Sequence, residues 1–471
     1  MKVLFVASEA GPFIASGGLG DVMGALPPEV SKKGQDTSVI LPLYDTIKEE
    51  YKKAMEWVAD ISFSLSWRKT GAAIYKLKHS SVDYYFVENH YYFDRGRLYG
   101  EFDDAERFAF FCRAVLEFIL NTGLRPDIIH ANDWQAAMSI VYLKTEYQKY
   151  DILKNIRTVY TIHNIEYQGK FDPYILGDVF GLDYKFKGLL EYDGCLNLMK
   201  GAIVAADSIT TVSPGYAEEL HHDFFAFGLA EIIKENAHKL SGVINGIDYG
   251  VFSPEKGKDI YRPYKLKDMK EGKAENKRKL QEELLLPSDG SPLVVMITRL
   301  ASQKGIDLLL CILDELLSEK LQLVILGTGE GEYENALSES CKKHSNLRAI
   351  LSFNRALSKK LYAAADIFLM PSKSEPCGLS QMIACSYGAV PVVRSVGGLK
   401  DTIIPYGEKK ANGFRFDNYN AHELLFTVKD AVSLYNEEEK WNQLSISAKR
   451  SKFKWDASAE KYISIYANLL N

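Results

Sequence analysis

Short apolar runs alternate with stretches of helical periodicity along this chain, and this alternation limits its possible folds more than any other feature. Most of the runs end in Gly, Asn, Asp, Ser or Pro, the residues that favour turns. The first half contains "KVLFVAS", "TSVILPLY", "SVDYYFVE", "PDIIHAND", "RTVYTIHN", "DSITTVSP" and "KLSGVINGID", and the second half contains "SPLVVMITRL", "LQLVILGTG", "NLRAILSF", "DIFLMPSKSE" and "AVPVVRSVGG". Strands separated by helices indicate βαβ units and a mainly parallel sheet. Because the pattern occurs twice, we expect two Rossmann-like, doubly wound α/β domains.

A polar, lysine-rich stretch at residues 252–290 separates the two halves. We interpret it as the connection that leads into the first helix of the second domain. The last segment, "SKFKWDASAEKYISIYANLLN", has apolar residues at helical spacing and predicts an amphipathic helix. We therefore expect domains at 1–245 and 246–452, and a C-terminal helix at 453–471 that crosses back to the first domain. Ligands of open parallel sheets bind beyond the carboxyl ends of the strands, so the expected site is a central cleft that both domains face.

Composition excludes several classes of function. The 471 residues carry a net charge of -5, so no broad basic field predicts binding to nucleic acid. The N-terminus lacks the features of a signal peptide, and no long uncharged apolar run predicts a membrane span. The six cysteines form no C-x-x-C pair, which favours reduced thiols and a cytoplasmic location. Neither histidine spacing nor an Asp-x-Asp motif predicts a metal site, and we expect no cofactor.

The stretch "PFIASGGLGD" places two glycines between the first strand and the first helix. Gly17 and Gly18 let the backbone approach a ligand, and a helix N-terminus favours an anion. The hydroxyl of Ser16 can add a further contact. Residues 10–21 contain no lysine or arginine, so the backbone would hold the anion here while cations approach from the other domain. The loop alone leaves the identity of this anion open.

Two cations follow the first strand of the second domain, in "TRLASQKG". Arg299 and Lys304 lie five residues apart in a strand-to-helix loop, an arrangement suited to a diphosphate, although alone they are equally consistent with surface charges. Nearby turns strengthen the first interpretation. "SEPCGLSQ" places Glu375 after a strand and before Gly378, where a carboxylate can accept hydrogen bonds from sugar hydroxyls; the alternative is a charge that stabilises a helix N-terminus. "SVGGLKD" supplies a second glycine pair, Gly397 and Gly398, at another such turn.

Polar residues also follow successive strands of the first domain. Asp133 comes after "DIIH", and His163 and Asn164 come after "RTVYTI". A single histidine at a strand end is more often structural, but an aspartate and a histidine facing a diphosphate site favour catalysis. The aromatic stretch "YYFVENHYYFDRGRLYG" is consistent with core strands and a loop, or with a surface that stacks sugar rings.

In these motifs the sequence resembles bacterial glycogen synthases and plant starch synthases, which are retaining glucosyltransferases of the GT-B fold. The resemblance runs through "GGLGDV", "HANDW", "TIHNIEYQG", "TVSPGYAEEL", "LSGVINGID", "RLASQKG", "PSKSEPCGLSQ" and "VVRSVGGLKDT" to the closing helix. It implies transfer of glucose from ADP-glucose or UDP-glucose to the nonreducing end of an α-1,4-glucan such as glycogen, with retention at the anomeric carbon. The sequence leaves the choice of nucleotide open.

Carried over position by position, the resemblance implies a catalytic set and a substrate-binding set. The catalytic set is Asp133, His163, Arg299, Lys304 and Glu375. The substrate-binding set is Ser16, Gly17, Gly18, Asp21, Asn164, Asn245, Phe353, Gly378, Gly397, Gly398 and Leu399. Within it, Phe353 corresponds to an aromatic residue against the nucleotide base, and Asn245 falls in the "NGID" hinge.

The sequence departs from the family pattern at a few positions. Ala15 replaces a lysine that contacts phosphate, Asn132 and Gln135 replace histidines that are optional in the family, and Arg355 stands where an acidic residue is common. The missing lysine leaves two alternatives open, namely a working synthase with altered donor affinity and a weakened, glucan-binding paralogue. A dinucleotide-dependent oxidoreductase is a third alternative because "LQLVILGTGEGE" is a strand followed by spaced glycines, although the full G-x-G-x-x-G motif is absent. A phosphorylase shares the fold but would require pyridoxal phosphate.

Overall fold

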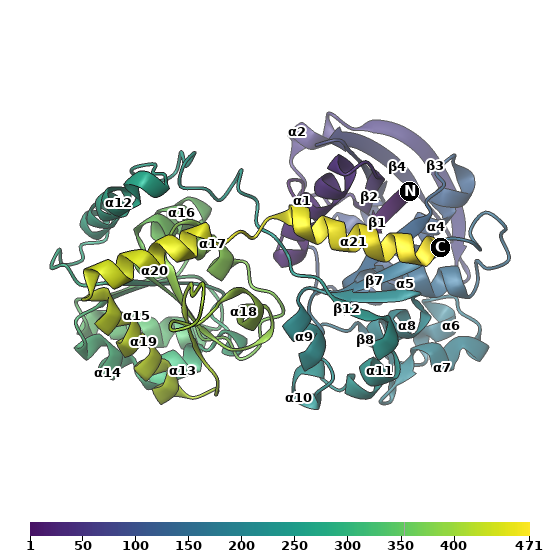
Figure 1. Cartoon of the computed structure of the whole chain (residues 1–471). Helices are drawn as coiled ribbons and strands as arrows, with labels where there is room; N and C mark the ends of the chain where they lie inside the picture. The colour runs from purple at the N-terminus through teal and green to yellow at the C-terminus, as the bar shows by residue number, and fades with distance from the viewer. Residues whose placement is uncertain (353) are drawn as a thin grey trace. The chain divides into compact units, whose positions relative to one another are not determined.

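The structure is a computed structural model that describes residues 1–352 and 354–471. The chain packs into two units (Figure 1). Unit 1 combines Met1–Ile244 with the C-terminal segment Trp455–Asn471, and unit 2 is the continuous segment Asn245–Lys454. The chain therefore passes from one unit to the other twice.

Unit 1 is built on a nine-stranded sheet with the order β12-β11-β7-β6-β1-β2-β5-β4-β3. The strands are β1 (Lys2–Val6), β2 (Asp36–Pro42), β3 (Glu56–Leu65), β4 (Arg68–His79), β5 (Val82–Glu88), β6 (Ile128–Asn132), β7 (Arg157–Ile162), β11 (Ser208–Thr211) and β12 (Leu240–Gly242). All neighbouring pairs are parallel except those that involve β4, which is antiparallel to both β3 and β5. A small sheet is formed by β8 (Lys170–Phe171), β9 (Glu191–Tyr192) and β10 (Cys195–Asn197).

Unit 2 contains a six-stranded, fully parallel sheet with the order β15-β14-β13-β16-β17-β18. The strands are β13 (Leu293–Ile297), β14 (Gln322–Leu326), β15 (Leu347–Ile350), β16 (Ile367–Met370), β17 (Val390–Arg394) and β18 (Phe414–Phe416). Their inward-facing aliphatic side chains form one core with α13 (Ile306–Cys311) and α19 (Ala421–Tyr435). The predicted parallel α/β architecture of both halves is confirmed.

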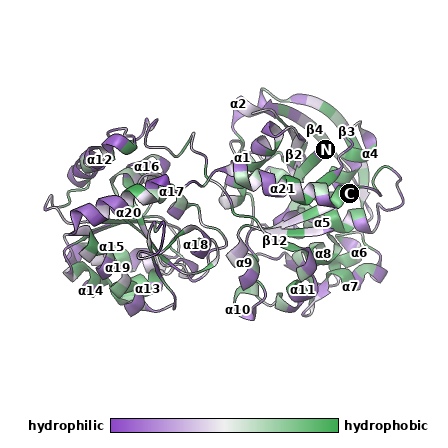
Figure 2. Ribbon diagram, in the orientation of Figure 1, coloured by the Kyte–Doolittle hydropathy of each residue, from purple (hydrophilic) through white to green (hydrophobic). Residues whose placement is uncertain are grey.

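Two helices illustrate how hydropathy and burial agree (Figure 2). Nearly all side chains of helix α5 (Asp133–Lys144) are buried, beside β6 and between α4 (Asp104–Asn121) and α8 (Leu198–Ala205), and residues 136–143 of this helix are mostly hydrophobic. Helix α12 (Met269–Glu283) is mostly hydrophilic and buries only one side. The hydropathy of each helix thus follows how deeply it is buried in its own unit.

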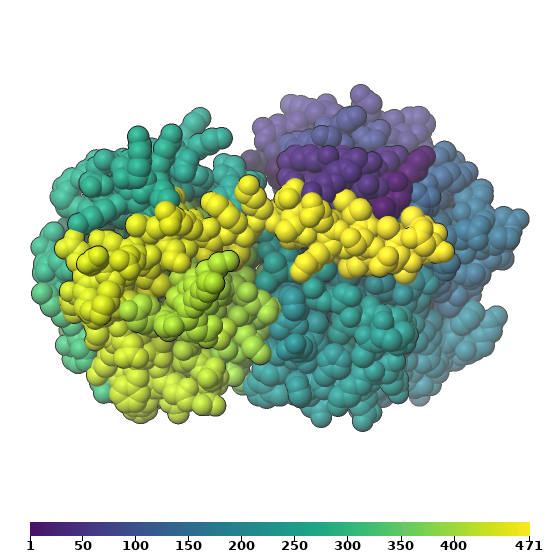
Figure 3. All heavy atoms as spheres, in the orientation of Figure 1, coloured from purple at the N-terminus to yellow at the C-terminus, as the bar shows by residue number. Residues whose placement is uncertain are grey.

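The C-terminal helix α21 (Trp455–Leu470) lies on the surface of unit 1, beside α1 (Gly18–Lys32), as Figure 3 shows. Lys33 forms ion pairs with Asp456 (2.7 Å) and Glu460 (2.8 Å). The Ser458 hydroxyl donates a hydrogen bond to the Ile244 carbonyl over 2.6 Å. These contacts attach the last helix to the unit that contains the N-terminus.

Candidate active site

The candidate residues of unit 1 follow the carboxyl ends of β1, β6 and β7, which are adjacent in the sheet. Glu9 follows β1, Asp133 follows β6, and His163 follows β7. The backbone N–H of His163 donates to the Asp133 carboxylate over 2.7 Å, which joins the last two of these residues directly. The structure therefore brings Asp133 and His163 together, and adds Glu9 to their surroundings.

The loop before α1 folds over Glu9, which is only 3% exposed. The Ser16 N–H donates to Oε2 of Glu9 over 2.5 Å. Burial raises the pKa of the Glu9 carboxyl, hydrogen bonds from the loop oppose this rise, and nearby Asp21 adds to it. The loop thus contains acidic side chains and no basic ones, so the anion predicted here would depend on backbone N–H groups.

Gly17 and Gly18 have no structural need to be glycine. Neither has a positive φ, and a Cβ atom at either position would have open space around it. Gly20 differs, because a Cβ there would lie 2.5 Å from the Cβ of Ala15. The free space beside Gly17 and Gly18 is the space that a ligand approaching the helix N-terminus would use.

Asp133 has an unusual backbone and an unusual pKa. Its φ of 56° lies in the left-handed region, which costs a non-glycine residue energy and is typical of functional sites. Burial raises the pKa of its carboxyl to about 7, and hydrogen bonds from the backbone of His163 and Asn164 oppose the rise. Burial also lowers the pKa of His163 to about 3, so its imidazole is neutral at physiological pH. Both groups can therefore exchange hydrogen bonds with a neutral ligand.

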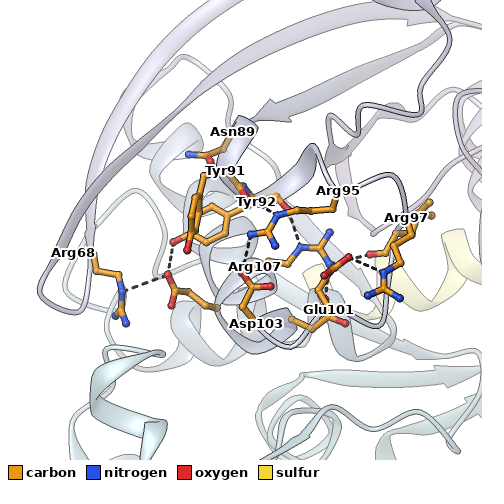
Figure 4. A network of polar contacts seen from close by, with 12 residues as sticks. Arg68, Asn89, Tyr91, Tyr92, Arg95, Arg97, Glu101, Asp103 and Arg107 are labelled. Carbon is orange, nitrogen blue, oxygen red and sulfur yellow. Dashed lines mark hydrogen bonds and ion pairs between the residues drawn. The ribbon is translucent and has the colours of Figure 1, made fainter.

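Tyr99 approaches the same strand ends from the segment between α3 (His90–Phe93) and α4. Its hydroxyl lies 2.8 Å from Oγ of Ser8, and burial raises its pKa, with Glu9 and Asp133 contributing. An arginine-rich network holds this segment (Figure 4). Fully buried Arg107 donates to the carbonyls of Tyr92 and Leu98 and to Asp104, Arg95 pairs with Asp103, and Arg97 pairs with Glu101.

The aromatic stretch that contains this segment is mostly core. Tyr84, Phe86, Tyr92 and Phe93 are buried, whereas Tyr91 is 66% exposed. The interpretation as core strands and a loop describes most of the stretch.

The candidate residues of unit 2 follow β13, β16 and β17, which are likewise adjacent. Lys304 and Glu375 are brought together, with 2.7 Å between Nζ and Oε2. The Ser372 hydroxyl donates to the same carboxylate oxygen over 3.1 Å. Arg299 is exposed, and its guanidinium has no hydrogen-bond or ion-pair partner among the residues that the structure describes. One cation is thus paired with the carboxylate, and the other is available to an anion.

The glycines of unit 2 have structural roles in the loops that carry these side chains. Gly378 (φ 70°) and Gly397 (φ 40°) have left-handed backbones. A Cβ on Gly398 would lie 2.2 Å from the carbonyl oxygen of Cys377, and the Gly398 N–H donates to the Glu375 carbonyl. These glycines pack the loop after β17 against the loop that contains Glu375, whether or not they also contact a ligand.

The structure describes three further predicted residues. Asn164 accepts a hydrogen bond from the Glu166 N–H, and Leu399 is buried in α18 (Gly397–Thr402). Asn245 begins unit 2, and its buried Oδ1 has no hydrogen-bond partner within the described residues. Phe353 lies outside the residues that the structure describes.

Sequence reasoning missed Glu9 and Tyr99 and assigned no role to Asn132. Glu9 could have been found, because it follows the first strand as Asp133 follows β6. The position of Tyr99 depends on the fold of a long loop, and no local pattern indicates it.

The described residues contain no group of three or more His, Cys, Asp or Glu side chains placed to hold a metal ion. None of the described helices is both long and apolar enough to cross a membrane.

Two α/β units, each with a mainly parallel sheet and polar residues at the strand ends, are typical of GT-B glycosyltransferases. Comparison with known proteins confirms this class. Residues 2–235 match the family model of the starch synthase catalytic domain, and residues 277–447 match that of glycosyl transferases group 1. The sucrose-phosphate synthase of Thermosynechococcus elongatus shares the fold, with a TM-score of 0.64 at 16% identity over 99% of this chain and 98% of that chain.

Nearer relatives define the family. A glycogen synthase of Alkaliphilus metalliredigens is 45% identical over the whole of both chains, and one of Clostridium botulinum is 46% identical over 100% of this chain and 99% of its own. The catalytic domain of starch synthase IV from Arabidopsis thaliana, solved with ADP and acarbose, has a TM-score of 0.91 and 32% identity over 99% of each chain. The chain belongs to the glycogen synthase and starch synthase family.

Proposed function

We propose that this chain is a glycogen synthase that transfers glucose from ADP-glucose to the nonreducing end of an α-1,4-glucan, with retention at the anomeric carbon. The observation that carries the proposal is its 45% identity to a glycogen synthase over the full length of both chains. The related starch synthase was solved with ADP and acarbose, which supports ADP as the nucleotide and a glucan as the acceptor.

In this proposal the donor diphosphate binds at the strand ends of unit 2. The nucleoside diphosphate is the leaving group, and it gains negative charge as its bond to the anomeric carbon of glucose breaks. Arg299 and Lys304 stabilise that charge. A preorganised donor of this kind contributes about 3–4 kcal/mol to the transition state. The exposed, unpaired guanidinium of Arg299 supports this role, since a cation that is already paired would have to exchange partners first. Glu375 orients Lys304 and accepts hydrogen bonds from hydroxyls of the donor.

The glucose and the acceptor lie against unit 1 in this proposal. His163 bonds a glucose hydroxyl, and Asp133 positions the glucose or the acceptor. Attack by the acceptor hydroxyl on the face from which the diphosphate leaves accounts for retention without a covalent intermediate. Exclusion of water from the bound donor would limit its hydrolysis.

The other predicted substrate-binding residues would add contacts to the diphosphate, the sugar and the nucleotide. The loop at Ser16, Gly17, Gly18 and Asp21 would meet the diphosphate, which the open space beside its glycines supports. Asn164, Asn245, Gly378, Gly397, Gly398, Leu399 and Phe353 would complete the contacts to sugar and nucleotide. We also propose a cytoplasmic location, which the six free cysteines support.

The structure weakens the oxidoreductase alternative. A Cβ on Gly327 would lie 1.8 Å from the Thr298 carbonyl oxygen, and one on Gly329 would lie 2.1 Å from that of Leu300. These glycines are therefore required where the loops after β13 and β14 pack together, and a dinucleotide is not needed to explain them.

Release of nucleoside diphosphate, measured with ADP-glucose and UDP-glucose in the presence and absence of glycogen, tests the function. We expect glycogen-dependent release of ADP, and slower release of UDP. Glycogen binding without release from either donor would instead show a weakened paralogue.

A further inference from the structure

Asn132 is a fully buried amide whose orientation is fixed by its neighbours. Its Nδ2 donates to the carbonyl oxygens of His130 (3.0 Å) and Val6 (3.2 Å). An amide nitrogen carries two hydrogens, so both are used in these bonds. If the amide group of Asn132 were rotated by 180°, Oδ1 would face these two carbonyl oxygens, and neither of them can donate a hydrogen bond. Oδ1 therefore points away from them.

On that other side, Oδ1 of Asn132 lies 3.0 Å from Nε2 of His163. Because Oδ1 can only accept, Nε2 carries the hydrogen of this bond. A neutral imidazole has a single N–H, so Nδ1 of His163 presents a lone pair. The ring is half-buried, and Nδ1 has no hydrogen-bond partner among the residues that the structure describes. One nitrogen is thus occupied by the protein, and the other can accept a hydrogen bond.

Asp133 fixes the backbone of His163. Its carboxylate accepts a hydrogen bond from the His163 backbone N–H, while the Asn132 side chain accepts one from the His163 ring. Backbone and imidazole are therefore fixed separately by two consecutive residues at the end of β6. The register of the sheet makes this possible, since Asn132 is paired with Thr161, two residues before His163.

We propose that Asn132 is a positioning residue that holds His163 in the Nε2–H tautomer, so that Nδ1 accepts a hydrogen bond from a hydroxyl of the bound sugar. The proposal rests on the proposed function for the identity of the ligand. It also predicts which ligand group His163 contacts. The Nδ1 lone pair of His163 attracts a hydroxyl group that donates a hydrogen bond, and it repels a phosphate oxygen. His163 is thereby directed to the glucose and away from the diphosphate.

The tautomer can be observed in the wild-type protein without any activity measurement. We would label the histidines with ¹⁵N and identify the His163 signals as those lost in His163→Ala. At pH 7 we expect Nε2 to be bonded to hydrogen and Nδ1 to be of the unprotonated, pyridine type. Protonation of Nδ1 at pH 7, alone or together with Nε2, would overturn the proposal even if the protein proved to be an active synthase.

A double-mutant cycle tests the functional consequence. Asn132→Leu keeps the approximate size of the side chain but cannot bond the ring, and we expect kcat to fall about tenfold. In the His163→Ala background the same change should cost less than twofold, because its effect passes through the imidazole. ADP affinity should stay within twofold in all variants. Equal losses of kcat in both backgrounds would assign Asn132 a structural role only.

Asn132→Asp is a second variant for the case that Asn132→Leu does not fold. It keeps the acceptor toward Nε2 but places an oxygen where Nδ2 donates to the carbonyls of Val6 and His130, so its urea transition is measured first. The negative charge of the introduced carboxylate favours the doubly protonated imidazolium, the Asp133 carboxyl acts in the same direction when ionised, and His130 is neutral. We expect Nδ1 to gain a proton in the ¹⁵N spectrum, and kcat to fall at least tenfold at pH 7. An unchanged kcat with Nδ1 protonated would show that the lone pair is not used.

Discussion

Lys304 and Glu375 form an ion pair in which each side chain is less than one-fifth exposed, and the pair predicts different effects for its two members. Glu375→Ala keeps the cation but removes the carboxylate that orients it and bonds the donor hydroxyls, whereas Lys304→Ala removes the cation and leaves a shielded carboxylate unpaired. We expect both variants to lower kcat by at least about a hundredfold. ADP affinity should fall only in Lys304→Ala. Lys342→Ala, which breaks an exposed pair with Glu339, is the matched control. Near-normal turnover by folded Glu375→Ala would contradict the assignment.

Asp133 predicts a pH dependence of stability. Its pKa of about 7 in the folded protein exceeds the ordinary value of 3.8, so between these values the folded state holds a proton that the unfolded chain has lost. The free energy of unfolding contributed by this group therefore falls as the pH rises from about 4 to about 7, by at most about 1.4 kcal/mol per pH unit. Asp133→Asn should remove this slope. Urea denaturation at pH 4.5, 6 and 7.5 measures it, and parallel pH curves for the two proteins would refute the prediction.

At the scale of elements, the loop before α1 predicts separate effects on donor binding and on stability. Gly18→Val places its side chain in open space, so we expect an unchanged melting temperature and loss of donor binding. Gly20→Val is the matched control, because its Cβ would clash with Ala15 and destabilise the loop. Donor binding that survives in Gly18→Val would show that this loop does not contact the donor.

Ala15→Lys is the opposite change in the same loop. Ala15 is exposed and lies near the acidic residues Glu9 and Asp21, so a lysine is accommodated and reduces the local negative charge. We expect the donor KM to fall about ten- to thirtyfold, equivalent to roughly 1–2 kcal/mol, with little change in kcat. Steady-state kinetics with ADP-glucose measures both, and an unchanged KM would contradict a phosphate near position 15.

The elements show what the sequence could predict. Every apolar run named above contains a strand, and most of these strands are parallel and almost fully buried, which leaves a continuous aliphatic signal. The short strands β8, β9, β10 and β18 were missed because two or three residues give no pattern. Strands β3 and β4 were missed because much of their surface is solvated and their side chains are mixed. Arg299, Lys304, Glu375, Asp133 and His163 were accessible because each follows a strand closely. The role of Asn132 was not, because it depends on carbonyls of β1 and β6 and on a ring after β7, which only the sheet register brings together.

At the scale of the whole molecule, unit 1 depends on the far end of the chain. Trp455, Tyr462 and Tyr466 of α21 are buried, and burial of one large apolar side chain contributes about 1.5–3 kcal/mol. The Tyr466 hydroxyl also lies 2.7 Å from Nδ1 of buried His130. We expect residues 1–244 alone not to unfold cooperatively. Residues 245–454 form a continuous unit and should do so.

The control joins residues 1–244 to residues 455–471 through a short flexible linker, which the hydrogen bond between Ser458 and Ile244 allows. This chain should regain a cooperative urea transition. A cooperative transition of similar midpoint for residues 1–244 alone would show that α21 is dispensable.

The late position of α21 in the chain also sets an order of events during synthesis. The ribosome makes the first strands of unit 1 early, but it releases the helix that covers them only after all of Asn245–Lys454 has been translated. At about 5–20 residues per second, the nascent N-terminal unit waits for roughly ten to forty seconds with its α21-binding surface bare. Unit 2 has no such dependence and can finish while the chain is still attached. The half of the protein that is made first is therefore the half that is completed last.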